Sequence, residues 1–453
     1  MEILFTSNGY PPRETAGVEL YTHNLAGAFS GRHNVNIFCR TVERSRREYD
    51  VMRETSGCAG VARMVNNLAG VFQPACYYSD TRAEGIFEEY LREISPDVVH
   101  VQHLMGLSGG YLKIVKEAGI PLVVTLHDYW FICPRFQLVD ESGSSCRGPE
   151  GGLRCARECP NSLFSVGAGG FFGAGAKFIF KYMPPGLQRK LKQMVREGKI
   201  SDLGKRGTGV SPEKFQKRAE FLKDALLKAD EIIAPSGFVR DVFVENGFPP
   251  GRITVIPHGI RLPACKPVKP GRTVRFGYMG SLAPLKGVSF LADAFGRLGG
   301  AAEMHVYGHG GENHEIILSG LRKLANDARI VFHGGYAFDD IGDILAGIDV
   351  IVIPSLWPET FNIVMREAFA CGVPVIASDA GALPEGVADG INGLLFKMAD
   401  ADDLLGKMRM IVSEPGLIEK FRSNIAPVKD ISAHASEIEA IYLKALRTGR
   451  THN

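Results

Sequence analysis

Residues 354–379 read PSLWPETFNIVMREAFACGVPVIASD, and this stretch decides the fold of the second half of the chain. The β-branched run DVIVIP leads into it and PVIAS closes it, and both are typical of buried strands. Between them, FNIVMREAFACG has apolar residues at helical spacing and ends at Gly372, a common residue just past a helix C-terminus. A strand, a loop, a helix and a second strand in this order predict a parallel sheet covered by helices.

The loop before this helix combines free backbone amides with two carboxylates. A helix that begins near Phe361 leaves the amides of Phe361, Asn362 and Ile363 without intrahelical partners, so they can bind an anion. Glu359 lies just before them, and Glu367 lies about one and a half turns along the helix. Carboxylates accept hydrogen bonds from hydroxyls rather than from phosphates. The pattern favours a nucleotide sugar, with one carboxylate on the sugar and one on the ribose diol, over two solvated helix carboxylates.

The overall composition is that of an ordinary globular protein. The chain has 453 residues, 45% hydrophobic and 23% charged, which is enough for two or three domains with their own cores. A formal net charge of +2 predicts no general attraction to nucleic acid. The chain begins with the strand-like MEILFTS, with Glu2 where a signal peptide has a cation, and no run approaches the ~20 apolar residues of a membrane span. Nine cysteines, an odd number, suggest thiols in a reducing compartment, so we expect a cytoplasmic protein.

Short β-branched runs alternate with helical patterns along the chain, which predicts two parallel α/β sheets. In the first half these runs are EILFTS, VNIFC, VVHVQ, LVVTL, EIIAPS and ITVIP. In the second half they are VRFGYMG, MHVYG, IVFHG, VIVIP, VIAS and GLLF, and the Pro- and Lys-rich RLPACKPVKPGR lies between the two sets. Parallel sheets bind ligands at the carboxyl ends of their strands, so two facing sheets would form one cleft.

The stretch quoted first resembles the donor-site motif of the retaining glycosyltransferases of family 4, which have the GT-B fold. FGYMGSLAPLKGVSFLADAF, NGYPPRETAGVELYTHNLAGAF, TLHDYW, IIAPS and VIPHGI are similar to other motifs of that family, in the expected order. The resemblance implies two facing Rossmann-like domains, an acceptor-side domain at 1–260 and a nucleotide-sugar domain at 273–425, joined by a linker at 261–272. A C-terminal helix at 426–453 is expected to return to the first domain. Residues 134–215 lack a clear counterpart and form an insertion.

On the donor side, Lys286 follows a strand-end turn, and its ammonium group would offset the charge that grows on the leaving diphosphate. Many family members have an arginine beside the glycine of this turn, where this chain has Ser281, so Lys286 and the helix amides would hold more of the diphosphate. The resemblance places Tyr336 beside the nucleobase, where its ring would stack, although packing alone is common for such an aromatic. Asn362 replaces a glycine of many relatives, and its amide stays available.

On the acceptor side, Gly17 opens the first helix, and a glycine there lets a ligand approach the backbone closely. The loop before it lacks the G-x-G-x-x-G pattern, so a nicotinamide cofactor has little support. His127 ends the strand PLVVTL. The resemblance implies that its ring contacts the transferred sugar, whereas a purely structural loop histidine is the alternative. We expect Asp128 to orient that ring or to cap the next turn, and His258 to be structural.

The resemblance implies a retaining hexosyl transfer from a UDP- or GDP-sugar to a glycan or lipid-linked acceptor, in polysaccharide or glycolipid synthesis. Glu359 and His127 would act at the sugar and Lys286 at the diphosphate, whose leaving oxygen would accept the acceptor's proton. No Asp-x-Asp metal motif is evident, so we expect catalysis without a metal ion. Two alternatives stay open, a nucleotide-sugar epimerase of the same fold and a binding protein that holds a nucleotide sugar without turnover.

The insertion has two features of its own. Cys133, Cys146, Cys155 and Cys159 lie close together in the sequence, but only the Cys155–Cys159 spacing suits a zinc site. A structural zinc and unpaired thiols are therefore the two alternatives. Residues 165–200 run from a glycine-rich apolar half to a basic amphipathic half, which would lie on an anionic membrane at its inner face and hold a lipid-linked acceptor, or pack as a lid.

Overall fold

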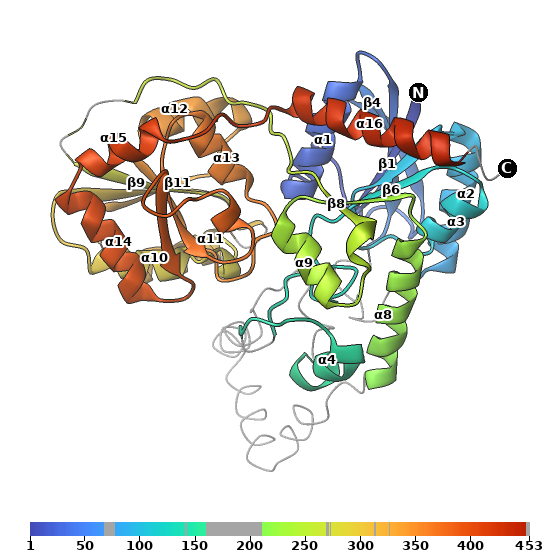
Figure 1. Ribbon diagram of the computed structural model, residues 1–453, viewed down its shortest axis with the longest axis horizontal. Helices are drawn as coiled ribbons and strands as arrows, with labels where there is room; N and C mark the ends of the chain where they lie inside the picture. Colours follow the sequence, from blue (N-terminus) through green and yellow to red (C-terminus); the bar gives the residue numbers. More distant parts are fainter. Residues whose placement is uncertain are drawn as a thin grey trace, which may run out of the picture.

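The computed structural model describes residues 1–67, 78–140, 143–159, 211–268, 271, 273–311, 314–325 and 327–449. They form two α/β domains that lie side by side, each built on one sheet (Figure 1). The prediction of two sheets that are parallel almost throughout is confirmed. The basic segment at 165–200 lies outside the described residues. Within the described ranges, no helix combines the length and the apolar character needed to cross a membrane.

The first sheet has the strand order β3-β4-β2-β1-β5-β6-β7-β8, and only the β3–β4 pair is antiparallel. Its strands are β1 (Glu2–Ser7), β2 (Asn34–Thr41), β3 (Val51–Ser56), β4 (Ala59–Val65), β5 (Val98–Val101), β6 (Leu122–Thr125), β7 (Glu231–Ala234) and β8 (Ile253–Val255). Successive residues of a strand point to opposite faces, so Leu4 joins one core while Ile3 and Phe5 join the other. Both faces of this sheet are therefore buried.

Helices of the first domain cover these two faces. They are α1 (Gly17–Phe29), α2 (Thr81–Ile94), α3 (Tyr111–Glu117), α8 (Pro212–Leu227) and α9 (Gly237–Glu245), with the short α4 (Leu153–Glu158) packed against α8. The N-cap of α2 is Asp80, whose carboxylate accepts from the amides of Arg82 and Ala83. Because β1, β5 and β6 are parallel, their carboxyl ends all lie at the same end of the sheet.

The hairpin of β3 and β4 was not among the predicted strands. β3 is an edge strand in which no residue is fully buried and most residues are polar, so its sequence VMRETS lacks the apolar run by which the other strands were found. The turn after it includes Gly57 at a φ of 62°, a left-handed conformation that glycine adopts readily. Arg63 on β4 is fully buried and bonds Glu54 of β3 at 2.6 Å. Its guanidinium group also donates to the carbonyl oxygens of Tyr10 at 2.9 Å and Pro11 at 3.0 Å, which attaches the hairpin to the loop after β1.

The second sheet is entirely parallel and has the order β11-β10-β9-β12-β13-β14. Its strands are β9 (Val274–Met279), β10 (Ala302–Tyr307), β11 (Ile330–Gly334), β12 (Val350–Ile353), β13 (Val375–Asp379) and β14 (Gly393–Lys397). Its helices are α10 (Val288–Gly296), α11 (His314–Ala325), α12 (Ile341–Ala346), α13 (Ile363–Ala370), α14 (Ala401–Ser413) and α15 (Gly416–Ser423). The strand order reverses between β9 and β12, the type of position where parallel sheets bind ligands.

The chain passes between the domains twice, and the two passages lie side by side. The amide of Ile260 donates to the carbonyl of Lys429 at 3.1 Å, and the amide of Ile431 donates to the carbonyl of Ile260 at 2.8 Å. The last helix, α16 (Ile431–Gly449), then runs back over the first domain beside α1 (Figure 1). Its Tyr442 is buried there and its hydroxyl lies 2.6 Å from His100 Nδ1.

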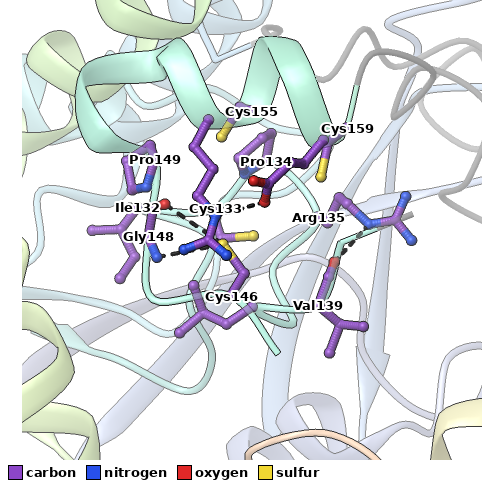
Figure 2. Close-up of a pocket in the computed structure, with 13 residues that line it drawn as sticks. Ile132, Cys133, Pro134, Arg135, Val139, Cys146, Gly148, Pro149, Cys155 and Cys159 are labelled. Carbon is purple, nitrogen blue, oxygen red and sulfur yellow. Dashed lines mark hydrogen bonds and ion pairs between the residues drawn. The ribbon is translucent and has the colours of Figure 1, made fainter. Parts of the chain in front are cut away.

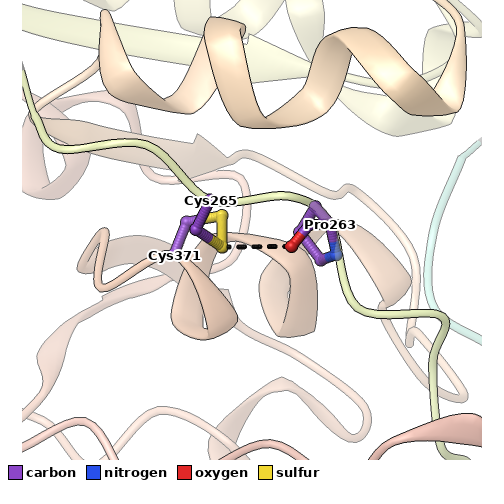
Figure 3. The surroundings of a disulfide bond; sticks show 3 residues. All are labelled: Pro263, Cys265 and Cys371. Atoms are coloured by element: carbon purple, nitrogen blue, oxygen red, sulfur yellow. Dashed lines mark hydrogen bonds between the residues drawn. A yellow bond between two sulfur atoms is a disulfide. The ribbon is translucent and has the colours of Figure 1, made fainter.

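After the chain leaves the first domain near Ile260, a disulfide bond attaches it to the second domain. It joins Cys265 to Cys371, the residue that ends α13 (Figure 3). The prediction that the cysteines are thiols is wrong for this pair, because the fold brings together two residues that are 106 positions apart. Lys266 adds an ion pair to Asp343 at 2.6 Å. Both contacts hold this segment against α12 and α13.

Candidate active site

The loop between β12 and α13 places its side chains at the boundary of the two domains. Helix α13 begins at Ile363, two residues later than predicted, because Asn362 acts as its N-cap and accepts from the amide of Met365 at 2.8 Å. The sequence interpretation had missed this role of Asn362. Within the described residues, the amides of Phe361, Asn362 and Ile363 donate to no protein group. The predicted anion site at the start of the helix is therefore free to receive a ligand.

Glu359 is the centre of a compact hydrogen-bond cluster. Its side chain is 2% exposed, and its Oε1 accepts from Lys286 Nζ at 2.7 Å, from Ser355 Oγ at 2.6 Å and from Trp357 Nε1 at 3.0 Å. All three bonds go to one oxygen, which leaves Oε2 for another donor. The sequence predicts that Glu359 and Lys286 meet through a shared ligand, but it does not point to Ser355 or Trp357 as partners of the carboxylate.

Lys286 follows β9 and Glu359 follows β12, the two neighbouring strands between which the strand order reverses. Lys286 ends the short helix η4 (Pro284–Lys286) after β9, and its Nζ lies 5.0 Å from the centre of the Trp357 ring. Gly287 follows at a φ of 77°, and a Cβ atom there would lie 1.9 Å from the carbonyl oxygen of Pro354. Only glycine allows the two loops to approach this closely, so the Lys-Gly pair fixes the ammonium group beside the carboxylate.

Glu367 lies in the middle of α13 and is 7% exposed. Burial away from water raises the pKa of this carboxyl group to about 7. Burial, and then the negative charge of Glu367, also raise the pKa of Tyr336. Burial, and then the charges of Glu359 and Tyr336, raise the pKa of Tyr278 on β9. Glu359 and Glu367 both belong to the unit of β12, loop and α13, and both are buried.

His127 follows β6 at the ligand-binding edge of the first sheet. Its Nε2 lies 2.8 Å from Oε1 of Gln102, and a carbonyl oxygen only accepts, so in this arrangement Nε2 carries the proton and Nδ1 is an acceptor. Burial, and then the nearby His103, lower the pKa of His127 well below its usual value, so the ring is neutral at neutral pH. Asp128 does not orient this ring; it lies 2.9 Å from His103 and caps the amide of Trp130.

Three hydrogen bonds join the Glu359 loop to the first domain. The hydroxyl of Tyr129 donates to the carbonyl of Pro358 at 2.9 Å, and that of Ser236 donates to the carbonyl of Thr360 at 2.9 Å. The hydroxyl of Thr360 donates in turn to the carbonyl of His127 at 2.7 Å. The structure therefore brings the predicted donor-side and acceptor-side residues to the same interdomain boundary.

Gly17, Ser281 and His258, all within the described residues, form no hydrogen bond or ion pair with Glu359 or Glu367. Gly17 is the first residue of α1, and a Cβ atom there would meet nothing within 4 Å, so the space beside it is open. The backbone carbonyl of Ser281 accepts from the hydroxyl of Tyr278, and its side chain accepts from the amide of Ala283. Ser281 thus shapes the turn before Lys286. His258 is 7% exposed, and its ring centre lies 4.9 Å from that of His127.

Cys133, directly before the insertion, and Cys146, Cys155 and Cys159 within it line one small pocket beside α4 (Figure 2). Among the described residues, no group of three or more histidines, cysteines or acidic residues is arranged to hold a metal ion, so the structural-zinc prediction has no geometric support here. Cys133 and Cys155 are buried, and burial raises the pKa of each. As neutral thiols they behave as small apolar groups in the packing of this segment.

Comparison with known protein families gives two matches. The family described as "Glycosyl transferases group 1" matches residues 273–414, and that described as "Glycosyltransferase Family 4" matches residues 15–145 and 206–262. The second match leaves out residues 146–205, which fall within the predicted insertion. Together the matches include the whole second sheet and every strand of the first sheet except β1.

Curated relatives align with part of the chain. The alpha-maltose-1-phosphate synthase of Mycobacterium tuberculosis is 29% identical over 224 residues, 44% of this chain and 57% of the relative. The D-inositol 3-phosphate glycosyltransferase of Mycobacterium marinum is 30% identical over 170 residues, 34% of this chain and 35% of the relative. The chain thus spans only part of the length of these relatives, 57% of the first and 35% of the second.

Solved structures align over nearly the whole chain. Sucrose-phosphate synthase from Thermosynechococcus elongatus has a TM-score of 0.64 at 18% identity, covering 98% of this chain and 99% of that one. The Anabaena protein HepE in complex with UDP has a TM-score of 0.63 at 18% identity, covering 98% and 100%. At this level of identity the likeness shows the fold.

Proposed function

Because the chain belongs to the family-4-like glycosyltransferases with the GT-B fold, we propose that it moves a hexosyl unit from a UDP- or GDP-sugar to a hydroxyl group of a glycan or lipid-linked acceptor. The transfer retains the configuration of the anomeric carbon. The observation that carries this proposal is the contact of Lys286 with Glu359 at 2.7 Å, directly before the free amides of α13. One cation, one helix N-terminus and two buried carboxylates suit a diphosphate with a hydroxylated group on each side.

The proposed roles follow from charge and from hydrogen-bonding capacity. Lys286 and the amides of Asn362 and Ile363 hold the diphosphate, where negative charge grows as the bond from the anomeric carbon to phosphate oxygen breaks. Oε2 of Glu359 accepts from hydroxyls of the donor sugar, and Glu367 accepts from the ribose diol. The neutral ring of His127 offers Nδ1 to a sugar hydroxyl.

The proposed transfer needs no side chain as a base, because the leaving diphosphate takes up the proton of the acceptor. The leaving diphosphate takes the electron pair of the broken bond, and the acceptor hydroxyl oxygen bonds to the anomeric carbon from the same face. The proton of that hydroxyl passes to the departing phosphate oxygen. Because Lys286 and the helix amides supply positive charge at the diphosphate, we propose that this step needs no metal ion.

A nuclear magnetic resonance experiment tests the reaction type. The full chain is incubated with UDP-glucose, UDP-galactose or GDP-mannose and a mixture of sugar acceptors, and the anomeric proton of the first product is recorded. Retention of the donor's configuration is expected, together with release of the nucleoside diphosphate. An inverted product would contradict the proposed mechanism. A converted nucleotide sugar formed without acceptor would favour the epimerase alternative.

The affinity for the donor is expected to depend on pH through Glu367. An ionised carboxylate accepts hydroxyl hydrogen bonds at both oxygens, whereas a protonated carboxyl group carries a donor on one of them, and burial raises the pKa of Glu367 to about 7. Affinity for UDP-glucose should therefore weaken about tenfold from pH 8 to pH 6, as protons compete with the ribose diol. Isothermal titration calorimetry checks this, and Glu367→Gln should bind more weakly at pH 8 with no such pH dependence. A wild-type affinity that is constant from pH 6 to 8 would contradict the ribose assignment.

Cytoplasmic location and attachment to the inner face of a membrane remain predictions from the sequence. The attachment depends on residues 165–200, which lie outside the residues that the structure describes. Flotation with anionic liposomes, using the full chain and a form without residues 165–200, tests the attachment. Recovery of the full chain alone in the liposome fraction is expected, whereas equal recovery of both forms would end the membrane proposal.

A further inference from the structure

The Cys265–Cys371 disulfide is accessible from solvent on one side (Figure 3). Cys265 is exposed, so a dissolved thiol can reach it, and Cys371 is partly buried. The other described cysteines are free, and Cys58 alone among them is exposed. Exposed disulfides are the ones that cellular thiols reduce most readily. In the cytoplasm, where we expect this chain, a disulfide is usually transient and often senses the redox state.

Helix α13 connects this disulfide to the donor site. The amide of Cys371 donates to the carbonyl of Glu367 at 3.2 Å, so the disulfide and the buried carboxylate lie one helical turn apart. The free amides of Asn362 and Ile363 lie at the other end of the same helix, which has eight residues. Displacement of the C-terminal end of α13 therefore moves the groups that we assign to the ribose and to the diphosphate.

Both passages between the domains are attached at this end of α13. The disulfide attaches the first passage. The second passage follows α15, where Arg422 Nε donates to the carbonyl of Gly372 at 2.9 Å. The two passages also bond to each other, since the amide of Ile260 donates to the carbonyl of Lys429. The C-terminal end of α13 is thus where the second domain holds the chain that leads to the first domain.

Two ion pairs accompany the disulfide on the segment at 260–266. Arg261 bonds Asp339 at 3.2 Å. Lys266 bonds Asp343 at 2.6 Å, and all four side chains are more than half exposed. Ion pairs between exposed groups contribute little to stability, because water and salt screen them. Cleavage of the disulfide therefore removes the strongest of these three attachments and lets the segment move relative to α13.

We propose that the Cys265–Cys371 disulfide is a reversible redox site that controls the affinity of the donor site. The inference rests on the proposed function and adds its regulation. In the oxidised form the bond holds the segment at 260–266 on α13, which favours the arrangement with Lys286, the helix amides and Glu367 in place. In the reduced form the segment is released, fewer molecules hold that arrangement, and the nucleotide binds more weakly.

The exchange needs only thiols as co-reactants. The thiolate of a cellular thiol attacks Sγ of Cys265, the exposed half of the bond, and forms a mixed disulfide with it. The electron pair of the broken S–S bond leaves with Cys371, which takes up a proton. A second thiolate then attacks the reductant's sulfur in the mixed disulfide and releases Cys265 as a thiol. The protein gains two electrons and two protons, and the two reductant thiols lose them as they form their own disulfide.

The test compares the two redox states of the native full chain. The protein is treated with glutathione disulfide or with excess glutathione, and alkylation followed by peptide mass spectrometry reports the state of the two cysteines. Calorimetric titration with UDP and with GDP then gives the dissociation constant of each form. We expect glutathione to open the bond and to raise the dissociation constant about fivefold, as follows if about a fifth of the reduced molecules hold the competent arrangement.

Three variants separate this disulfide from the other cysteines. Cys265→Ser and Cys371→Ser should both bind the nucleotide as the reduced wild type does, with or without glutathione disulfide. Cys58→Ser, at an exposed free cysteine in the turn between β3 and β4, is the matched control and should respond to the two treatments as the wild type does.

Each other outcome overturns the inference at a different step. A bond that stays intact in the native protein under excess glutathione would be purely structural. Equal dissociation constants for the oxidised and reduced wild type would remove the control of the donor site, and a response that persists in Cys265→Ser would assign it to other cysteines. If neither UDP nor GDP binds in either state, the proposed function fails and its regulation with it, whereas alkylation still shows whether the disulfide exchanges.

Discussion

Glu359→Gln should lower kcat by about 100- to 1,000-fold, the usual cost of removing one charged group that acts on the transition state. The substitution keeps the shape of the side chain but removes the charge that Lys286, Ser355 and Trp357 surround. Nucleotide binding should be equal or tighter, since Lys286 is no longer neutralised by a carboxylate 2.7 Å away. Steady-state kinetics and calorimetry with the nucleoside diphosphate measure the two effects separately.

The control for this substitution is Glu414→Gln, an exposed residue at the end of α14. It should transfer sugar at the wild-type rate, which shows that loss of one negative charge alone has no effect. A wild-type kcat in Glu359→Gln would remove Glu359 from the proposed catalytic group. A large loss of nucleotide affinity in the same variant would instead assign the residue to binding.

Lys286→Ala should weaken the binding of a nucleoside diphosphate by about 10- to 100-fold. A charge-assisted hydrogen bond contributes about 1.5–3 kcal/mol, and each 1.4 kcal/mol is about a factor of ten. The variant also leaves the buried carboxylate of Glu359 without its cation, so that its charge repels the diphosphate. Calorimetric titration with the nucleoside diphosphate gives the dissociation constant directly.

A double variant separates these two contributions. In the double variant Lys286→Ala/Glu359→Gln, the carboxylate of Glu359 no longer repels the diphosphate. The affinity is then lowered only by the loss of the Lys286 hydrogen bond. Its dissociation constant should therefore lie between those of the wild type and Lys286→Ala. Lys420→Ala on α15 is the exposed control and should bind as the wild type does. Wild-type affinity in Lys286→Ala would contradict the assignment of this residue to the diphosphate.

The donor half of the site was predictable because its elements are local in the sequence. Glu359, the amides at the start of α13 and Glu367 lie within nine residues of one strand–loop–helix unit, where spacing alone fixes their relation. The contact of Lys286 with Glu359 joins residues 73 positions apart, and it required the resemblance rather than the spacing. Ser355 and Trp357 lie in the same loop as Glu359, and a search for hydrogen-bond donors beside that carboxylate would have found them.

The acceptor half was less predictable, because its side chains come from separate strands. Gln102 and His127 meet only after β5 and β6 pair, and single polar residues at strand ends carry no distinctive pattern. The Cys265–Cys371 disulfide escaped prediction for the same reason, since cysteine counts do not give pairings. His127 was identified by its position at the end of a strand, but its partner Gln102 was not.

A crystal structure of the full chain with a bound nucleoside diphosphate sugar tests the central claim most directly. We expect the diphosphate between Lys286 Nζ and the amides of Asn362 and Ile363, the ribose hydroxyls on Glu367 and the sugar hydroxyls between Glu359 and His127. A nucleotide bound elsewhere, or bound here with its phosphates away from Lys286, would contradict the account.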